Sequence, residues 1–193
     1  MTRRADAQEN RAELLAAASD VFAEQGVDAP LDLVRQRAKV GRATMYRHFP
    51  DRRGLHVALV EEALLRFEAV LPRRPGHAVD LFDLLDLAAR EAARSPALHS
   101  VWDKLRDTPV APAFLSRFRK VFTAPLEEAR AAGRVPPHLT VDDLFLAVRM
   151  LGAASRGSVA RTRDIEARRA LHLLMTGLGH MPDGHPEISH GPS

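Results

Sequence analysis

Apolar residues recur along this chain with the spacing of α-helices. The first stripe consists of Leu14, Leu15, Ala18, Val21 and Phe22. Its spacing of i, i+4, i+7 and i+8 places these side chains on one face of an amphipathic helix. Gly26 follows the stripe, and glycine readily adopts the left-handed conformation that ends a helix. The pattern therefore predicts a first helix over residues 10–25.

Two short helices and one longer helix are predicted next. Pro30 suits the first turn of the second helix, where a missing N–H group has no consequence. Gly41 breaks the pattern before a third helix over residues 42–48. Asp51 is then placed to cap the N-terminus of a fourth helix over residues 52–71.

The rest of the chain continues the helical pattern. After a break at the prolines that follow the fourth helix, apolar stripes predict helices over residues 80–94, 96–106, 114–132, 140–155 and 162–178. Pro125 is expected to kink or restart the helix over residues 114–132. Thr140 and Asp143 resemble a capping box that opens the helix over residues 140–155. No segment is typical of a strand, so we expect an all-α fold.

Two unequal domains and a tail are expected. The three short helices form an N-terminal domain over residues 1–52, and the later helices form a larger domain over residues 53–179. Residues 180–193 are rich in Pro, Gly, His and Ser and are expected to be disordered. The histidines of this tail are His180, His185 and His190. Because the segment is expected to be disordered, we predict no metal site and no cofactor there.

Composition narrows the classes of protein. At 46% hydrophobic and 27% charged residues, the 193-residue chain can bury a core. No apolar run approaches the roughly 18–20 residues that span a bilayer, and the first ten residues are too polar for a signal peptide. We therefore expect a cytoplasmic protein that does not enter a membrane. The absence of cysteine excludes disulfides, thiolate nucleophiles and cysteine-ligated zinc.

Positive charge is concentrated near the second and third helices. The formal net charge of +3 is small, but basic residues dominate between Leu33 and Arg53, where the only acid is Asp51. These basic residues are Arg35, Arg37, Lys39, Arg42, Arg47, Arg52 and Arg53. Such a patch favours a polyanionic partner, although a solvated charged surface would have the same composition.

The two short helices fit a helix-turn-helix that binds DNA. We expect Val34, Ala38, Val40, Met45 and Phe49 to pack on the first helix. The third helix would then direct outward Arg42, Ala43, Thr44, Arg47 and His48. Arginine suits bidentate contact with guanine, and hydroxyl or imidazole groups such as those of Thr44, Tyr46 and His48 suit phosphates. Arg52 and Arg53 would add positive charge at the next helix N-terminus.

These residues also carry a family resemblance. The segments are Gly26-Val27-Asp28-Ala29-Pro30-Leu31-Asp32, Ala38-Lys39-Val40-Gly41 and Thr44-Met45-Tyr46-Arg47-His48-Phe49-Pro50-Asp51-Arg52. They closely resemble the DNA-binding region of TetR-family repressors, over roughly residues 10–65. The resemblance implies an all-helical homodimer that binds double-stranded DNA and has a ligand-binding and dimerisation domain after the helix-turn-helix. It also implies that Arg42 and Ala43 read bases and that Arg52 contacts a phosphate. The predicted DNA-binding residues are Arg42, Ala43, Thr44, Tyr46, Arg47, His48, Arg52 and Arg35.

Four positions depart from the pattern of that family. Lys39 stands where the turn usually has glycine, which predicts left-handed strain or a shifted turn. Arg35 replaces a small alanine, and it either reaches a phosphate or crowds the packing. Arg53 and Gly54 replace an acidic residue and an alanine, which weakens initiation of the fourth helix.

Residues 2–4 form either a minor-groove arm or a terminus without function.

The C-terminal residues suggest a ligand cavity and a dimer interface. The candidate ligand-binding residues are Trp102, Phe82, His99, Arg106, Phe118, Phe122, Arg149 and Met150, and the alternative is an ordinary bundle core. The candidate interface residues are Gly152, Ser155, Leu171, Leu174 and Leu178, because small residues allow close helix approach. By the resemblance, the last two helices of each subunit form a four-helix interface.

The sequence therefore predicts a repressor that binds a pseudo-palindromic operator as a homodimer and is released by a small, largely apolar effector. The alternatives are a helical protein-interaction adaptor, an activator, and a regulator that acts without a small-molecule ligand. No nucleophile motif surrounds Ser155 or Ser158, so an enzyme is not expected.

Overall fold

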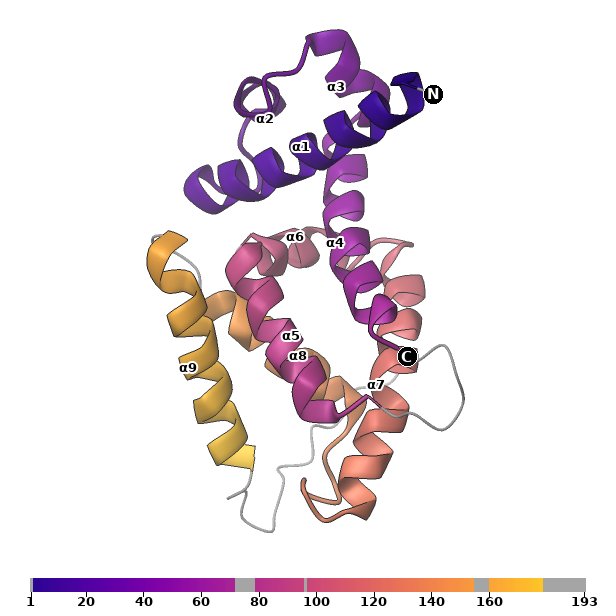
Figure 1. Ribbon diagram of the computed structural model, residues 1–193, viewed down its shortest axis with the longest axis vertical. Helices are drawn as coiled ribbons and strands as arrows, with labels where there is room; N and C mark the ends of the chain where they lie inside the picture. Colours follow the sequence, from indigo (N-terminus) through magenta and orange to yellow (C-terminus); the bar gives the residue numbers. More distant parts are fainter. Residues whose placement is uncertain (1, 72–78, 96, 155–159, 179–193) are drawn as a thin grey trace.

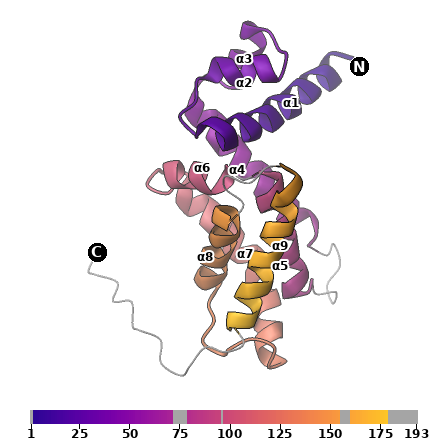
Figure 2. The same ribbon diagram turned by 90° about the vertical axis from the view of Figure 1, so that its left-hand side faces the viewer.

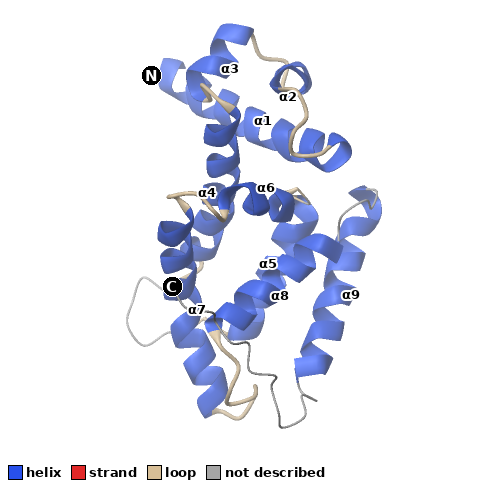
Figure 3. Cartoon of the chain, turned by 180° about the vertical axis from the view of Figure 1, so that it is seen from behind, coloured by secondary structure: helices blue, strands red, loops and turns tan. Residues whose placement is uncertain are grey.

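The computed structural model describes residues 2–71, 79–95, 97–154 and 160–178. In these ranges all regular structure is helical, as Figure 3 shows, so the all-α prediction is confirmed. The helices are α1 (Thr2–Gln25), α2 (Leu31–Arg37), α3 (Arg42–His48), α4 (Arg52–Ala69), α5 (Leu81–Arg94), α6 (Leu98–Leu105), α7 (Ala111–Ala131), α8 (Val141–Ala154) and α9 (Ala160–Leu178). The predicted tail over residues 180–193, with its three histidines, lies outside the described ranges.

The helices form two groups joined by α4 (Figure 1). Helices α1, α2 and α3 lie together at one end of the molecule, and α4 leads from them into a larger bundle made by α5 and α7–α9. Helix α6 lies between the two groups, beside the first half of α4. Its position allows it to contact both the helix-turn-helix and the interior of the bundle.

The first helix is longer than the apolar stripe predicts. It begins at Thr2, whereas the stripe predicted a start near residue 10. The added turns are rich in Arg, Ala, Gln and Glu, which have high helix propensity and need no buried face. Residues 2–4 therefore belong to a helix and do not form an extended arm.

Several predicted helix ends are confirmed by their hydrogen bonds. Gly26 has a φ of +87°, in the left-handed region that closes α1. The Asp51 carboxylate accepts from the backbone N–H of Gly54 at 2.7 Å and caps α4. Thr140 and Asp143 form a reciprocal capping box, in which each backbone N–H donates to the side chain of the other residue.

Pro125 does not restart α7, which runs without interruption from Ala111 to Ala131. The proline ring is buried in the core of the bundle, where α7 packs on α5 and α8.

The helix-turn-helix core is built as the sequence predicted. Val34, Met45 and Phe49 are almost wholly buried against α1, where Val21 and Phe22 meet them. The same hydrophobic cluster continues through the start of α4 into the inner side of α6. The DNA-binding candidate helices and α6 therefore share one continuous core.

Two buried polar contacts reinforce this junction. The Ser19 hydroxyl of α1 donates to the Ser95 hydroxyl, which lies just before α6, at 2.9 Å. His56 of α4 is buried and hydrogen-bonds through Nε2 to the Val27 carbonyl at 3.2 Å. Both contacts fix the orientation of the N-terminal helices on the bundle.

Candidate functional site

Helix α3 presents a basic outer face. Its inward side chain Met45 is buried, whereas Arg42, Ala43 and Arg47 are exposed and Thr44 is half-buried. Tyr46 is a large aromatic residue with 43% of its surface exposed. This tyrosine is not part of the core, and its position among arginines suits contact with another molecule.

Arg42 and Tyr46 are arranged as a pair on this face. The guanidinium carbon of Arg42 lies 5.7 Å from the centre of the Tyr46 ring, one helical turn away. A cation–π contact of this kind orients the guanidinium while its N–H groups stay available. The pair therefore offers a fork of donors beside a phenol hydroxyl.

The surroundings of His48 disfavour the protonated imidazole. Burial of the imidazole lowers the pKa of His48, and the nearby charges of Arg47 and Arg11 lower this pKa further. Its Nε2 atom is buried and has no hydrogen-bond partner among the described residues. Because this nitrogen is enclosed, contact of His48 with a phosphate or a base requires the side chain to move, and that contact stays a prediction.

Arg11 of α1 is a basic residue of this surface that the sequence interpretation missed. Its guanidinium carbon lies 4.9 Å from the centre of the Phe49 ring, at the end of α3. The available signal was its position three residues before Leu14, which places it beside the buried stripe of α1. Arg11 extends the basic face from α3 onto α1.

Two predicted DNA contacts have partners inside the protein. Arg52 donates through Nη1 to the carbonyls of Val27 and Ala29, at 2.9 and 2.6 Å, and so ties α4 to the loop before α2. Arg35 forms an ion pair with Asp32 at 2.7 Å, and its Nη1 lies 3.4 Å from the Val40 carbonyl. Arg35 therefore lies along the turn without crowding the core, and contact of either arginine with DNA stays a prediction.

Of the two outcomes predicted for Lys39, the structure has the left-handed backbone, with a φ of +57°. The N–H of Lys39 donates to the Gln36 carbonyl and the N–H of Val40 donates to the Arg35 carbonyl. This pair of bonds is the Schellman motif, in which the left-handed residue is usually glycine. The turn between α2 and α3 thus keeps ordinary geometry with a strained residue in it.

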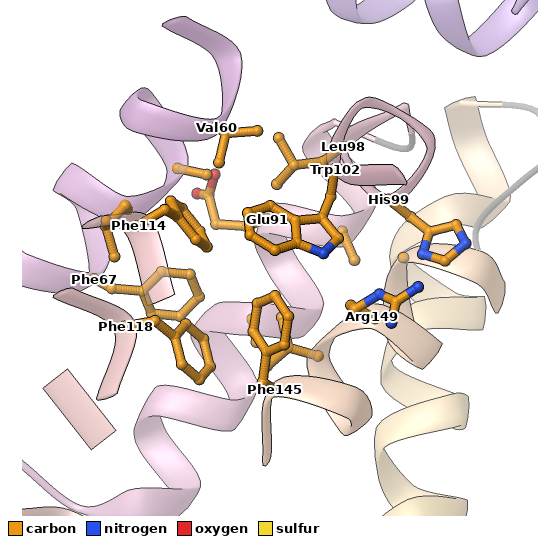
Figure 4. A pocket seen from close by; sticks show the side chains of 16 residues that line it. Val60, Phe67, Glu91, Leu98, His99, Trp102, Phe114, Phe118, Phe145 and Arg149 are labelled. Atoms are coloured by element: carbon orange, nitrogen blue, oxygen red, sulfur yellow. The ribbon is translucent and has the colours of Figure 1, made fainter. Parts of the chain in front are cut away.

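A cavity of about 60 Å³ lies inside the bundle, enclosed by α4–α8 (Figure 4). It is lined by Val60, Ala63, Leu64, Phe67, Ala88, Glu91, Ala92, Leu98, His99, Trp102, Phe114, Phe118, Phe145, Val148, Arg149 and Gly152. Aromatic rings form much of its wall, and the rings of Trp102 and Phe145 meet edge to face at 5.1 Å. An apolar cavity with a few polar groups is the usual form of a small-molecule site.

Both charged side chains of the cavity wall have ion-pair partners. Glu91 is buried, and its carboxylate accepts from Nη1 of Arg66 at 2.7 Å. Arg149 donates through Nη2 to the Asp103 carboxylate at 3.0 Å. In Figure 4 the two charged groups lie on opposite sides of the Trp102 ring.

The structure divides the predicted ligand-binding residues. Trp102, His99, Phe118 and Arg149 line the cavity, whereas the other four predicted residues do not. Phe145, which the sequence interpretation missed, lies on the inner face of α8 together with Arg149 and Gly152. The i, i+4, i+7 spacing of these three residues was the available signal.

Four of the predicted residues lie outside the lining of this cavity. Phe122 is fully buried behind the wall, stacked on Phe118. The ring of Phe82 contacts the guanidinium of Arg134, whose central carbon lies 5.0 Å from the ring centre. Arg106 is an exposed residue just beyond the end of α6. Met150 is 49% exposed on the outer face of α8, because it is one residue removed from Arg149 and so points to another side.

Helices α8 and α9 lie side by side (Figure 2). They carry exposed apolar side chains, among them Met150 and Leu173. A groove of about 400 Å³ lies between the two helices, lined by Met150, Ala154, Ala170, Leu173, Leu174 and Gly177. Leu173 has 64% of its surface exposed. Large apolar side chains gathered on one face in this way favour contact with another protein surface.

The predicted interface residues are placed differently from one another. Gly152 is buried and faces α6, where an added Cβ would lie 3.2 Å from the Cβ of His99, so its assignment to a subunit interface is wrong. Leu171 packs against the core of the bundle, whereas Leu174 also lines the groove. Ser155 and the side chain of Leu178 lie outside the described residues.

Neither a metal centre nor a membrane span is found in the described part of the chain. No group of three or more His, Cys, Asp or Glu residues there could hold a metal ion. Within the same ranges, no helix is long and apolar enough to cross a membrane.

The comparisons with known proteins agree on one family. Residues 14–59 match the family model described as "Bacterial regulatory proteins, tetR family". No curated protein matches the chain. The TetR transcription regulatory protein from Mycobacterium vanbaalenii is 30% identical, with 91% of this chain and 98% of that chain covered and a TM-score of 0.57.

Two further solved structures share the fold. A TetR transcriptional regulator from Streptomyces coelicolor is 24% identical, with 90% of this chain and 99% of that chain covered and a TM-score of 0.58. A gamma-butyrolactone receptor described as ArpA-like is 21% identical, with 88% of this chain and 85% of that chain covered and a TM-score of 0.58. The similarity to these structures extends beyond the helix-turn-helix over most of the C-terminal helices.

Proposed function

Because the chain belongs to the TetR family of bacterial regulatory proteins, we propose that it is a ligand-responsive transcriptional repressor. As a homodimer it binds a pseudo-palindromic operator through α3, and a small, largely apolar ligand in the bundle cavity releases it. The protein acts in the cytoplasm, where the DNA is, and has no enzymatic activity. The exposed Arg42–Tyr46 pair on α3 is the observation that carries it.

The chemistry of α3 supports DNA binding. A recognition helix reads the major groove with a few side chains, and an arginine fork fits the O6 and N7 atoms of guanine. Arg42 supplies the fork, Tyr46 supplies a phenol hydroxyl, and Arg47 and Arg11 supply charge for phosphates.

The apolar surface of α8 and α9 supports a twofold dimer. Leu173 and Met150 would be buried if the same face of a second copy packed against them, which would form a four-helix interface. In such a dimer the two α3 helices occupy successive major grooves about 34 Å apart.

The position of α6 supports coupling between the cavity and the DNA-binding helices. Trp102 and His99 of α6 line the cavity, and Lys104 of the same helix forms an ion pair with Asp28 of the loop before α2 at 2.7 Å. A ligand that displaces α6 therefore changes the position of the helix-turn-helix. Ligand and operator then favour different states, and the difference in affinity sets the induction.

The test is a fluorescence anisotropy titration with the DNA upstream of the protein's own gene. Replacing Arg42 and Tyr46 together by alanine should weaken specific binding by about a hundredfold or more, since each base contact contributes about 1–3 kcal/mol. The matched control is Arg90→Ala, which removes an exposed arginine of α5. Affinity for the operator should also fall steeply as salt rises, because phosphate contacts release counterions. Equal affinity of the double variant and the wild-type protein would refute the assignment of α3.

A further inference from the structure

The cavity between α4 and α8 has enough defined chemistry to indicate the class of its ligand. We propose that the ligand is an uncharged molecule with a single aromatic ring and a hydrogen-bond acceptor that faces Arg149. This inference rests on the proposed function, in which the cavity holds the effector.

The wall of the cavity favours a ring. The Trp102 and Phe114 rings lie 4.9 Å apart, and Phe145 meets both Trp102 and Phe118, at 5.1 and 4.9 Å, with interplanar angles above 70°. These rings present both faces and edges toward one space, as Figure 4 shows. A further aromatic ring placed among them gains offset or edge-to-face contacts that an aliphatic chain cannot make.

The charges of the wall favour an uncharged ligand. The buried carboxylate of Glu91 is already compensated by Arg66, and Arg94 approaches it at 3.7 Å. The guanidinium of Arg149 is compensated by Asp103. A charged ligand would therefore lose its hydration without meeting an uncompensated opposite charge, which is strongly unfavourable in an apolar site.

The small size of the cavity favours a ligand with no more than one ring. Its volume of about 60 Å³ is less than half that of the roughly 150 Å³ apolar cavity that is known to accept benzene. Even a single ring thus requires the wall to widen. Helix α6 packs closely on α8, since a Cβ added at Gly152 would lie 3.2 Å from the Cβ of His99. Displacement of α6 by a ligand would be transmitted to the helix-turn-helix, because Lys104 of α6 is paired with Asp28.

One donor at the edge of the cavity indicates the acceptor. The Nε atom of Arg149 is buried and has no hydrogen-bond partner in the described part of the chain. A buried N–H group without a partner is unfavourable, and a ligand oxygen that accepts from it removes that penalty. In Figure 4 the indole nitrogen of Trp102 lies on the same side of the cavity as Arg149. The polar end of the ligand is therefore expected at this side and its ring among the phenylalanines.

Trp102 allows a direct test, because it is the only tryptophan of the chain and its ring lines the cavity. The full-length protein is titrated with acetophenone, ethylbenzene, benzoate and benzylammonium, and quenching of tryptophan fluorescence is followed with correction for absorption. Acetophenone, a neutral ring with one carbonyl acceptor, should bind at least about tenfold more tightly than each of the other three, since a hydrogen bond to a charged donor contributes about 1.5–3 kcal/mol.

Variants assign the acceptor contact. Arg149→Met should weaken acetophenone binding about tenfold and leave ethylbenzene binding within about twofold of wild type. If this variant is poorly folded, Arg149→Lys keeps the positive charge beside Asp103 but lacks the Nε donor, and the same loss is expected. The control is Arg119→Met, which removes an exposed arginine that is likewise paired with an aspartate, Asp142.

Three results would overturn the inference: tighter binding of benzoate or benzylammonium than of acetophenone, unchanged acetophenone binding in both Arg149 variants, or no quenching by any probe. The anisotropy assay with operator DNA separates this failure from failure of the proposed function. Release of DNA by a charged ring would overturn the ligand class and support induction. Binding of acetophenone without any effect on DNA would support the ligand class and contradict induction.

Discussion

Replacement of Lys39 by glycine removes a backbone strain in the turn between α2 and α3. Lys39 has a φ of +57° at the position of a Schellman motif where a side chain is unfavourable. The end of α7 has the same pair of hydrogen bonds, with Gly133 as the left-handed residue at a φ of +66°. The chain therefore contains a strained and an unstrained copy of one motif.

The expected gain follows from two opposing terms. A left-handed backbone costs a residue with a Cβ about 1–2 kcal/mol relative to glycine. Glycine at the same position lowers the free energy of unfolding by about 0.4–1 kcal/mol, because it gives the unfolded chain more conformational freedom. Lys39→Gly should therefore raise the free energy of unfolding by about 0.5–1 kcal/mol, which corresponds to about 1–4 °C in Tm for a chain of this length.

The assay is thermal and urea denaturation followed by circular dichroism, with two matched variants. Lys39→Ala removes the same charge but keeps the Cβ, so it should be less stable than Lys39→Gly by about 1 kcal/mol. Gly133→Ala introduces the strain into the unstrained motif and should destabilise the protein by about 1 kcal/mol. If Lys39→Gly is no more stable than Lys39→Ala while Gly133→Ala is destabilised, the left-handed strain at Lys39 is refuted.

Three further predictions concern the apolar surface, the domain junction and pH. Leu173→Glu places a charge on the α8–α9 surface and should convert a dimer into a monomer in analytical ultracentrifugation, whereas Leu65→Glu, at a similarly exposed leucine of α4, should leave the dimer intact. Ser19→Ala and Ser95→Ala should each destabilise the protein by about 1–3 kcal/mol, because each leaves the other buried hydroxyl without its partner, and the double variant should cost less than the sum in urea denaturation. Burial lowers the pKa of His56, so the unfolded state takes up a proton first as the pH falls below about 6.5, and the free energy of unfolding should decrease from that pH downward. His56→Gln should flatten this dependence, and an identical slope in wild type and variant would contradict it.

Local rules predicted the helix-turn-helix well. The bounds of α3, the cap at Asp51 and the left-handed Lys39 all follow from neighbouring residues, and the structure has each of them. The start of α1 was missed because residues with high helix propensity extend a helix without any apolar signal in the sequence. Arg11 was missed for a related reason, since its approach to Phe49 depends on how α1 crosses α3.

The cavity was only partly predictable, because it depends on which face each bundle helix turns inward. Trp102 and Phe118 were correctly expected to line it, whereas Phe122 lies one turn from Phe118 and is buried behind the wall. Gly152 was assigned to a subunit interface because small residues permit close approach, but the helix that approaches it is α6 of the same chain. Sequence spacing identifies a small-residue contact without identifying the partner helix.

The most direct test of the account is a hydroxyl-radical footprint of the full-length protein on the DNA upstream of its own gene. Two protected regions should appear on one face of the duplex, with centres about one helical turn, or 34 Å, apart, and both should disappear when Arg42 and Tyr46 are replaced by alanine. A footprint that is the same for the wild-type protein and the double variant, or no protection by the wild-type protein, would contradict the central claim that α3 binds the operator as part of a twofold dimer.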